Sequence, residues 1–254
     1  MTCYGAACAS KMCAAARAAR ARQSARKTVD TRSMETSMSS RAEADAANTQ
    51  VSALPAHKAH GVGADIFGAA RLALAKLVQP ALNAADLTWY LDAGTLLGAY
   101  RSGEQIAHDD DFDIAAYVPD FQNDDLEAIR RKIAATLPAP YETRVVTSYA
   151  RKVEVFDSRS KTFLLPPAYQ GADFHVVTVD VQIMTDAAGG VRYLHDMLDH
   201  VRVPKHAIAP TGEIMLDGHM FSCPHAVVRF LEAQYGYIGS DAHFDTRTKL
   251  YVKN

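Results

Sequence analysis

The stretch WYLDAGTLLGAYRSGEQIAHDDDFDIAAYV, residues 89–118, decides the fold of this chain. An apolar segment leads into a Gly-Thr turn and a short apolar helix. Four aspartates within five residues then precede a second apolar segment. Carboxylates this close repel one another strongly unless a cation lies among them. The stretch therefore predicts a strand, a helix and a second strand arranged around an acidic site.

The acidic run holds Asp109, Asp110, Asp111 and Asp113. Side chains alternate along a strand, so a strand that begins at Asp111 directs Asp111 and Asp113 to one face and Phe112 to the other. Two carboxylates side by side suit Mg²⁺ when substrate phosphates fill its remaining positions. A solvated acidic turn is the alternative. We interpret the run as a metal-dependent phosphoryl or nucleotidyl transfer site.

Gly94 and Thr95 precede the apolar residues of the helix expected over 95–100. The N-terminus of a helix offers free backbone N–H groups and a positive dipole end to an anion. A phosphate-binding helix shortly before a metal-binding Asp-x-Asp suits a nucleotide-linked substrate. We therefore predict that Gly94, Thr95 and Gly98 form the phosphate-binding part of the site.

The segments GTLLGAYR (94–101) and DDDFDI (109–114), seven residues apart, resemble the signature of the LicD/fukutin family. The resemblance implies an α+β, nucleotidyltransferase-like fold of the polymerase-beta type, with a mixed sheet flanked by helices. It also implies transfer of a phospho-alcohol, such as phosphocholine or a phospho-alditol, from a CDP-linked donor to a glycan. The family usually has Pro-Trp before the aspartates, where this chain has Ala107-His108. The expected metal-binding carboxylates are unchanged, and the departure alters the wall of the pocket beside them, which bears on the substrate.

A third carboxylate is expected on the strand HVVTVDVQIM, residues 175–184. Val179 and Val181 share one face of this strand, while Asp180 and Gln182 share the other. A buried carboxylate is costly unless it is paired or bound to a metal. The resemblance implies that Asp180 completes the metal site. An ion pair between Asp180 and a basic residue is the structural alternative.

The metal ligands expected from these motifs are Asp111, Asp113 and Asp180, with Mg²⁺ or Mn²⁺ as the cofactor. Arg101 is expected to stabilise charge on the transferred phosphoryl group, because a guanidinium matches phosphate oxygens. A surface ion pair is the alternative for Arg101. Asp110 or its neighbour Asp109 either accepts the proton of the acceptor hydroxyl or orients the metal ligands.

The composition of the whole chain narrows the function classes. Its 254 residues, 48% of them hydrophobic, suffice for one good-sized domain and a tail. A net charge of −2 argues against a nucleic-acid binder, and no apolar run approaches the length of a transmembrane helix. The four cysteines show neither a disulfide framework nor zinc-site spacing. These features favour a reducing compartment such as the cytoplasm.

Residues 1–60 differ from the rest of the chain, which places the folded domain at 61–254. The first 29 residues contain no acid and carry six Lys or Arg residues among many alanines. An Arg-rich, acid-poor start is typical of a plastid or mitochondrial transit peptide. A disordered Ala/Arg tail or a misplaced start codon is the alternative.

Periodicity predicts helices over 64–82 and 124–137 and strands over 86–92, 112–117, 143–149 and 152–156. After Tyr193 the chain is expected to be mostly helical or irregular. The passage from Pro224 to Gly236 resembles the closing pattern of the family, a proline-led helix that ends in Tyr-Gly. The resemblance thus runs from about residue 88 to 236.

Two other functions share these motifs. One is a nucleotidyltransferase that moves NMP itself onto a small molecule or protein, which releases pyrophosphate rather than CMP. The other is a non-catalytic nucleotide-binding protein that retains the fold. The intact Asp111, Asp113 and Asp180 argue against the second.

Overall fold

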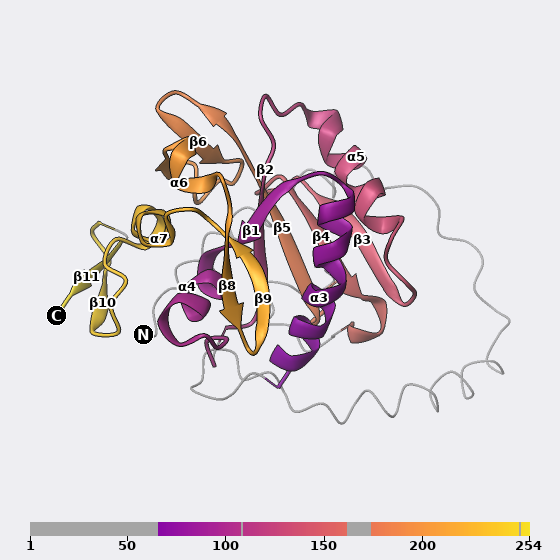
Figure 1. Cartoon of the computed structure of the whole chain (residues 1–254), viewed down its shortest axis with the longest axis horizontal. Helices are drawn as coiled ribbons and strands as arrows, with labels where there is room; N and C mark the ends of the chain where they lie inside the picture. Colours follow the sequence, from indigo (N-terminus) through magenta and orange to yellow (C-terminus); the bar gives the residue numbers. More distant parts are fainter. Residues whose placement is uncertain (1–65, 108, 162–173, 249) are drawn as a thin grey trace, which may run out of the picture.

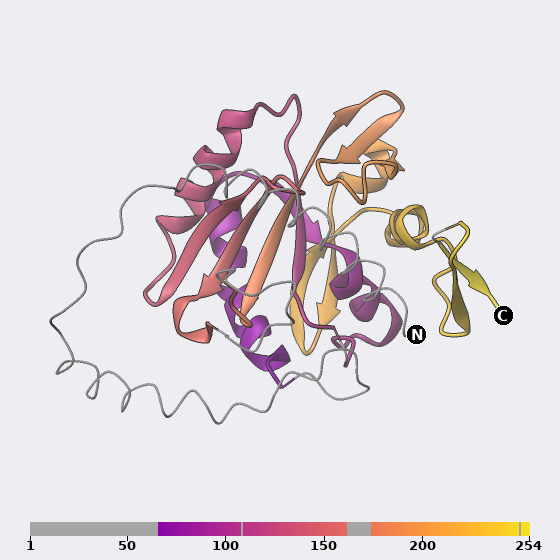
Figure 2. The same ribbon diagram turned by 180° about the vertical axis from the view of Figure 1, so that it is seen from behind.

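The computed structural model describes residues 66–107, 109–161, 174–248 and 250–254 (Figures 1 and 2). The expected tail, residues 1–60, and His108 lie outside the described residues. The tail, its boundary with the folded domain and the compartment therefore stay predictions. Among the helices of the described ranges, none combines the length and the apolarity needed to cross a membrane.

A seven-stranded mixed sheet forms the centre of the molecule (Figure 2). Its main path has the order β1-β2-β5-β4-β3, while β6 pairs with β5 and β7 pairs with β6. The strands are β1 (Thr88–Leu91), β2 (Asp113–Tyr117), β3 (Tyr141–Val146), β4 (Lys152–Asp157), β5 (Thr178–Ala187), β6 (Gly190–Tyr193) and β7 (Arg202–Val203). The pair β2–β5 is parallel and the other pairs are antiparallel. The expected mixed sheet is confirmed.

Helices flank this sheet, as expected. They are α3 (Gly68–Ala84), α4 (Ala93–Ser102), α5 (Asn123–Ala134), α6 (Lys205–Ile208) and α7 (Val227–Tyr235), with one 3-10 turn, η1 (Ser158–Ser160). The helices α3 and α5 lie together on one face of the sheet (Figures 1 and 2). The short helix α4 follows β1 directly and ends at Gly103, whose φ of 74° suits a glycine C-cap.

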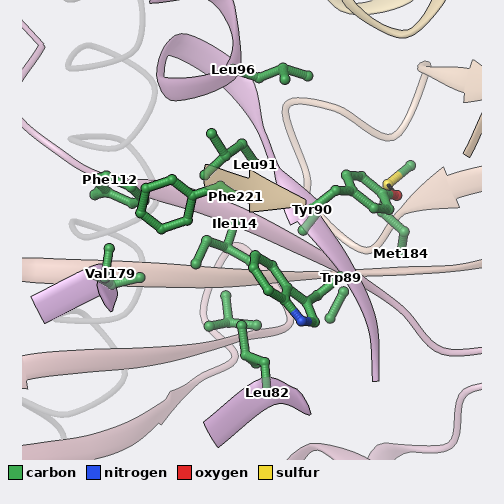
Figure 3. Packing of buried hydrophobic residues seen from close by; sticks show 14 of the residues in the cluster. Leu82, Trp89, Tyr90, Leu91, Leu96, Phe112, Ile114, Val179, Met184 and Phe221 are labelled. Atoms are coloured by element: carbon green, nitrogen blue, oxygen red, sulfur yellow. Dashed lines mark hydrogen bonds between the residues drawn. The ribbon is translucent and has the colours of Figure 1, made fainter. Parts of the chain in front are cut away.

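The position of the hydrophobic core follows from the alternation of side chains along the strands. On β5, Val179, Val181 and Ile183 belong to the same buried apolar cluster as Leu74 of α3. The residues between them, including Asp180, point to the opposite face of the sheet. Figure 3 shows the aromatic part of the core, where residues of β1 and β2 pack against the hairpin that follows α6. Apolar packing on one face thus leaves polar side chains of the same strands for a site on the other.

The expectation of a mostly helical or irregular segment after Tyr193 is wrong. Two hairpins occupy much of it: β8 (Gly212–Leu216) with β9 (His219–Cys223), and β10 (Ala242–Asp245) with β11 (Leu250–Lys253). The first turns at Asp217-Gly218, where φ is 47° and 73°. Two consecutive positive φ values define the turn that Asp-Gly favours between strands. That dipeptide was the sequence signal for the hairpin.

Phe221 places β9 on the core, because its ring lies 5.7 Å from that of Phe112 (Figure 3). The predicted closing helix is confirmed as α7, with Phe230 and Leu231 buried and Gly236 at its C-cap. The strand expected to begin at Asp111 begins instead at Asp113. Asp111 therefore belongs to the loop before β2.

Candidate active site

Four buried carboxylates lie in a row across the sheet, and we call them the acidic row: Asp92, Asp113, Asp180 and Glu154. Asp113 of β2 is the register partner of Asp180 of β5, which is in turn the partner of Glu154 of β4. Asp92 directly follows β1, and its N–H donates to the Asp113 carbonyl oxygen at 3.0 Å. Residues paired across neighbouring strands share a face of the sheet. The row therefore gathers acids that lie far apart in the sequence.

The loop before β2 adds three more carboxylates, which we call the acidic loop: Asp109, Asp110 and Asp111. Each offers an oxygen, and these three oxygens lie within 4.8 Å of one another. Asp110 is exposed, while Asp109 and Asp111 are half-buried. The tightest group of possible metal ligands among the described residues is thus the acidic loop, which shares Asp111 with the predicted set.

The proximity of these acids changes their pKa values. Burial raises the pKa of Asp111 to about 6, and the negative charges of Asp110 and Asp180 act in the same direction. Burial, followed by the charges of Asp111 and Asp180, raises the pKa of Asp113 well above its usual value. Burial and Asp111 do the same to the pKa of Asp109. The acidic loop and the acidic row therefore share one electrostatic environment, which a cation stabilises.

The metal-free protein is expected to lose stability by several degrees in melting temperature as the pH rises from about 4 to 6. For Asp111 the folded pKa of about 6 exceeds the ordinary value of 3.8, so folding favours the protonated form. That stabilisation is complete below the unfolded pKa and is lost as the pH rises through the folded one. Mn²⁺ should reduce the loss, because a bound cation replaces the proton. Melting curves in EDTA and in Mn²⁺ measure both effects.

The control for this pH dependence is Asp111→Asn. His195 contributes a pH dependence of the opposite sign, because burial and then Lys152 lower its pKa. The difference between the wild-type and Asp111→Asn curves isolates the contribution of Asp111. Parallel curves for the two proteins would contradict the prediction.

Asp180 has both an ion pair and an unpaired oxygen. Its Oδ2 accepts from the Lys152 ammonium, and both side chains are buried. Its Oδ1 is buried and has no hydrogen-bond partner among the described residues. The ion pair that was the structural alternative for Asp180 is thus present. The second oxygen remains available to another cation.

The helix α4 begins beside the acidic loop. A Cβ added to Gly94 would lie 2.4 Å from Asp109 Oδ2, so that carboxylate lies against the first turn of the helix. An anion at this place is stabilised by the free N–H groups and the helix dipole. Thr95 is buried, and its Oγ1 accepts from the Asp113 N–H at 2.9 Å. The structure thus brings Gly94 and Thr95 to the acids.

Gly98 and Arg101 have other partners in this structure. A Cβ on Gly98 would lie 2.6 Å from the Glu104 carbonyl oxygen, so a glycine is needed there for packing. The Arg101 guanidinium donates to the carbonyl oxygens of Ile238 and Gly239, each at 2.9 Å. These contacts tie α4 to the segment after α7. The predicted phosphate-binding roles of Gly98 and Arg101 stay predictions.

A buried hydrogen-bond network supports Asp92. Its Oδ1 accepts from the Tyr193 hydroxyl at 2.6 Å and from Gln234 Nε2 at 2.9 Å. Burial raises the pKa of Asp92, although these two hydrogen bonds act in the opposite direction. The next residue, Ala93, has a φ of 46°, which non-glycine residues rarely adopt. β6 and α7 therefore fix the turn from β1 into the site.

Sequence reasoning did not select Asp92, Lys152 or Glu154 as site residues. For the latter two a signal existed: in KVEVF, residues 152–156, the polar Lys152 and Glu154 alternate with valines. This pattern predicts a polar face on a buried strand. Asp92 ends an apolar run two residues before Gly94, and an aspartate at such a place is typical of a helix N-cap.

The mixed sheet flanked by helices, with Asp113 of β2 hydrogen-bonded to Thr95 in the first turn of α4 and paired with Asp180 of β5, agrees with the nucleotidyltransferase-like fold that the motifs imply. The family model "LicD/FKTN/FKRP, nucleotidyltransferase domain" matches residues 86–226, more than half of the chain. The chain belongs to this family, and the resemblance found in the motifs is confirmed.

Two curated relatives carry the name "Ribitol 5-phosphate transferase FKRP". The mouse protein (Mus musculus) is 29% identical over 171 residues, and the human protein (Homo sapiens) is 28% identical over 172 residues. Each alignment covers 64% of this chain and 30% of the relative, so the chain spans about a third of their length. A solved structure titled "Crystal Structure of ANT(2")-Ia in complex with adenylyl-2"-tobramycin" aligns with a TM-score of 0.38 and 15% identity. That alignment covers 63% of this chain and 72% of the other.

Proposed function

We propose that this protein transfers a phospho-alcohol from a CDP-linked donor to a hydroxyl group of a glycan or a related acceptor. Membership of the LicD/FKTN/FKRP family supports the reaction class. The name of the relatives, ribitol 5-phosphate transferase, favours a phospho-alditol over phosphocholine. The observation that carries the proposal is the pairing of Asp113 with Asp180 on adjacent parallel strands, next to Asp111 of the acidic loop.

Mg²⁺ or Mn²⁺ fits the donor set of this site. The unpaired Asp180 Oδ1 and the mutually repelling acids are hard oxygen ligands that lack a sufficient counter-charge. Asp111, Asp113 and Asp180 would hold the ion. A bound divalent ion supplies charge neutralisation for the diphosphate of the donor. Because α3 and α5 fix the strands from the other face, the protein keeps these carboxylates in place before the substrate arrives.

In the proposed step the acceptor oxygen attacks the phosphorus that carries the alcohol. The bond from that phosphorus to the bridging oxygen breaks, and CMP leaves with that oxygen. Asp109 or Asp110 takes the proton of the acceptor hydroxyl, and the raised pKa of Asp109 suits a base. We assign the donor phosphate to the first turn of α4, at Gly94 and Thr95. Arg101 would need to leave its present carbonyl partners to reach a phosphate.

The proposal predicts a nucleotide preference that depends on metal. CDP with Mg²⁺ should raise the melting temperature of the full chain more than ADP, GDP or UDP, because a ligand that binds the folded state stabilises it. At a concentration 100 times the dissociation constant the expected stabilisation is about 2.7 kcal/mol. Asp111→Ala should remove the shift. A thermal-shift titration with and without Mg²⁺ measures this prediction.

Product analysis then separates the reaction classes. CDP-ribitol, CDP-glycerol and CDP-choline serve as donors, with sugar and alditol hydroxyls as acceptors. Release of CMP supports phospho-alcohol transfer, whereas release of pyrophosphate from CTP with a nucleotidylated acceptor would support NMP transfer instead. Nucleotide binding without turnover in this screen would indicate a binding protein. Absence of any nucleotide or metal response in the wild type would refute the proposal.

A further inference from the structure

Lys152 supplies a buried positive charge directly at the proposed metal site. Its ammonium donates to Asp180 Oδ2 and lies 3.8 Å from Glu154 Oε1, and only 4% of its side chain is exposed. The ring centroid of Tyr149 lies 5.4 Å from the same nitrogen. Two carboxylates and an aromatic face thus enclose this cation.

We propose that Lys152 is the protein's own counter-ion for the metal site: its ammonium neutralises Asp180 when no metal is bound, and a divalent ion displaces it. This inference rests on the proposed function, because it requires the acidic row to bind a metal. Lys152 would then be a positioning residue that sets the metal affinity and keeps the metal-free site folded.

The register of the sheet explains why the Lys152 side chain can reach Asp180. Lys152 pairs with Gln182, and Glu154 pairs with Asp180, so Lys152 lies diagonally across from Asp180 on the same face. The acidic row and the acidic loop bring many carboxylates to this place, and a buried carboxylate without a counter-charge is costly. Lys152 offsets part of that cost without any ligand.

Competition between the ammonium and the metal follows from their charges. A divalent ion bound to Asp180 repels an ammonium held on the same carboxylate. The flexible four-carbon side chain of lysine allows its charge to move away. Removing the ammonium should therefore strengthen metal binding and weaken the metal-free fold. A purely structural ion pair would change stability without changing metal affinity.

A second interpretation gives the opposite sign. Lys152 could hold Oδ2 so that the unpaired Oδ1 of Asp180 faces the metal, as a group that orients a ligand. In that case removal of Lys152 would weaken metal binding. Arg144 pairs with Glu154 on the neighbouring strand, so the charge of Lys152 acts mainly on Asp180, with Glu154 3.8 Å away. The short contact of the ammonium with an Asp180 oxygen, inside a buried group of acids, favours the counter-ion.

The test is a Mn²⁺ titration of the full chain, followed by melting temperature and by the electron paramagnetic resonance signal of free Mn²⁺. Lys152→Met is expected to bind Mn²⁺ about 10-fold more tightly, the lower end of what a neighbouring charge does to the affinity of a carboxylate for a proton. Its melting temperature should be below wild type without metal and equal to wild type at saturating Mn²⁺. Lys152→Gln repeats the measurement with a polar side chain.

Two controls separate this effect from a change of net charge. Lys152→Arg keeps the cation and should keep the wild-type Mn²⁺ affinity. Lys205→Met removes a cation that pairs with Asp186 at 2.7 Å, on the exposed end of β5. Loss of Lys205 should leave Mn²⁺ binding unchanged, because an exposed charge is screened over this distance.

Each outcome bears on the inference. Unchanged or weaker Mn²⁺ binding in Lys152→Met and Lys152→Gln overturns it, as does unfolding of both variants even in saturating Mn²⁺. Recovery of their fold by Mn²⁺ supports it. If the wild type binds Mn²⁺ and releases CMP while the Lys152 variants bind Mn²⁺ with the same affinity, the counter-ion inference is wrong and the proposed function stands. If neither the wild type nor any variant binds Mn²⁺, both the counter-ion inference and the proposed metal-dependent function are wrong.

Discussion

Asp113→Asn is expected to raise the melting temperature of the metal-free protein while removing metal binding and turnover. Asp113 is buried among Asp111, Asp180 and Asp92, which together with burial raise its pKa well above the usual value. Its negative charge is therefore unfavourable to the metal-free fold at neutral pH. An amide of the same size removes the charge and can donate to a neighbouring carboxylate.

Asp113→Asn is expected to raise stability but to lower activity, because the same negative charge that destabilises the metal-free fold is needed to bind the metal. The melting temperature should rise by roughly 2–4 °C for each kcal/mol of relieved repulsion. Turnover, measured as CMP release, should fall about 10³-fold or more, since a metal ion contributes several kcal/mol to stabilising the transition state. The Mn²⁺ titration should show loss of binding in the same variant.

The matched control is Asp186→Asn, an Asp-to-Asn change on β5 outside the acidic row. Asp186 accepts from the Tyr117 hydroxyl at 2.6 Å and pairs with Lys205 at 2.7 Å. These partners lower its pKa, led by Lys205 and then Tyr117, so its charge is favourable and its removal should slightly destabilise the fold. If Asp113→Asn behaved like this control, with normal turnover and a lowered melting temperature, Asp113 would be a structural residue.

Gly94→Ala should leave the fold nearly as stable as wild type but reduce turnover about 100-fold, the typical cost of a misplacement near 1 Å. The added Cβ would lie 2.4 Å from Asp109 Oδ2, at the end of a side chain that can rotate away. Alanine also favours a helix over glycine by about 1 kcal/mol. The displaced carboxylate and the methyl group then occupy the place proposed for the donor phosphate. CMP release and the CDP-dependent thermal shift measure the loss.

Gly98→Ala in the same helix is the control for Gly94→Ala. There the added Cβ would lie 2.6 Å from the backbone oxygen of Glu104, which cannot rotate away. This variant should therefore lose about 1–3 kcal/mol of stability, the usual cost of overpacking. Loss of turnover without loss of stability at residue 94, and loss of stability at residue 98, would separate the two glycines. Equal loss of stability in both would contradict a phosphate site at Gly94.

Much of the site could be predicted from local patterns. The Gly-Thr turn, the Asp-x-Asp before β2 and the alternation around Asp180 identified the strand–helix–strand unit and the strand of Asp180, which are present. The mixed sheet was implied by the family resemblance of the same motif and is also present. These features depend on residues close together in the chain, where periodicity and motif spacing are informative. The Asp217-Gly218 turn was an equally local signal for the hairpin that was missed.

The remaining features depend on contacts between distant segments. The partners of Arg101 are 137 and 138 residues away, in the segment after α7, and the Tyr193 partner of Asp92 is 101 residues away. A motif fixes the type of a residue but not which carbonyl or hydroxyl lies beside it. The phosphate role of Arg101 and the supporting role of Asp92 could therefore not be decided from the sequence.

The sequence by itself determined the family, the mixed sheet with its helices, and the acids around which the site forms, because these are encoded in one motif and in short periodic segments. Only the tertiary structure decided which acids face one another and which cation accompanies them. Lys152 meets Asp180 across 28 residues because β4 and β5 pair in one register. A register shifted by one residue would direct Lys152 to the apolar face, so the packing of the valines between these residues fixes the electrostatics of the site.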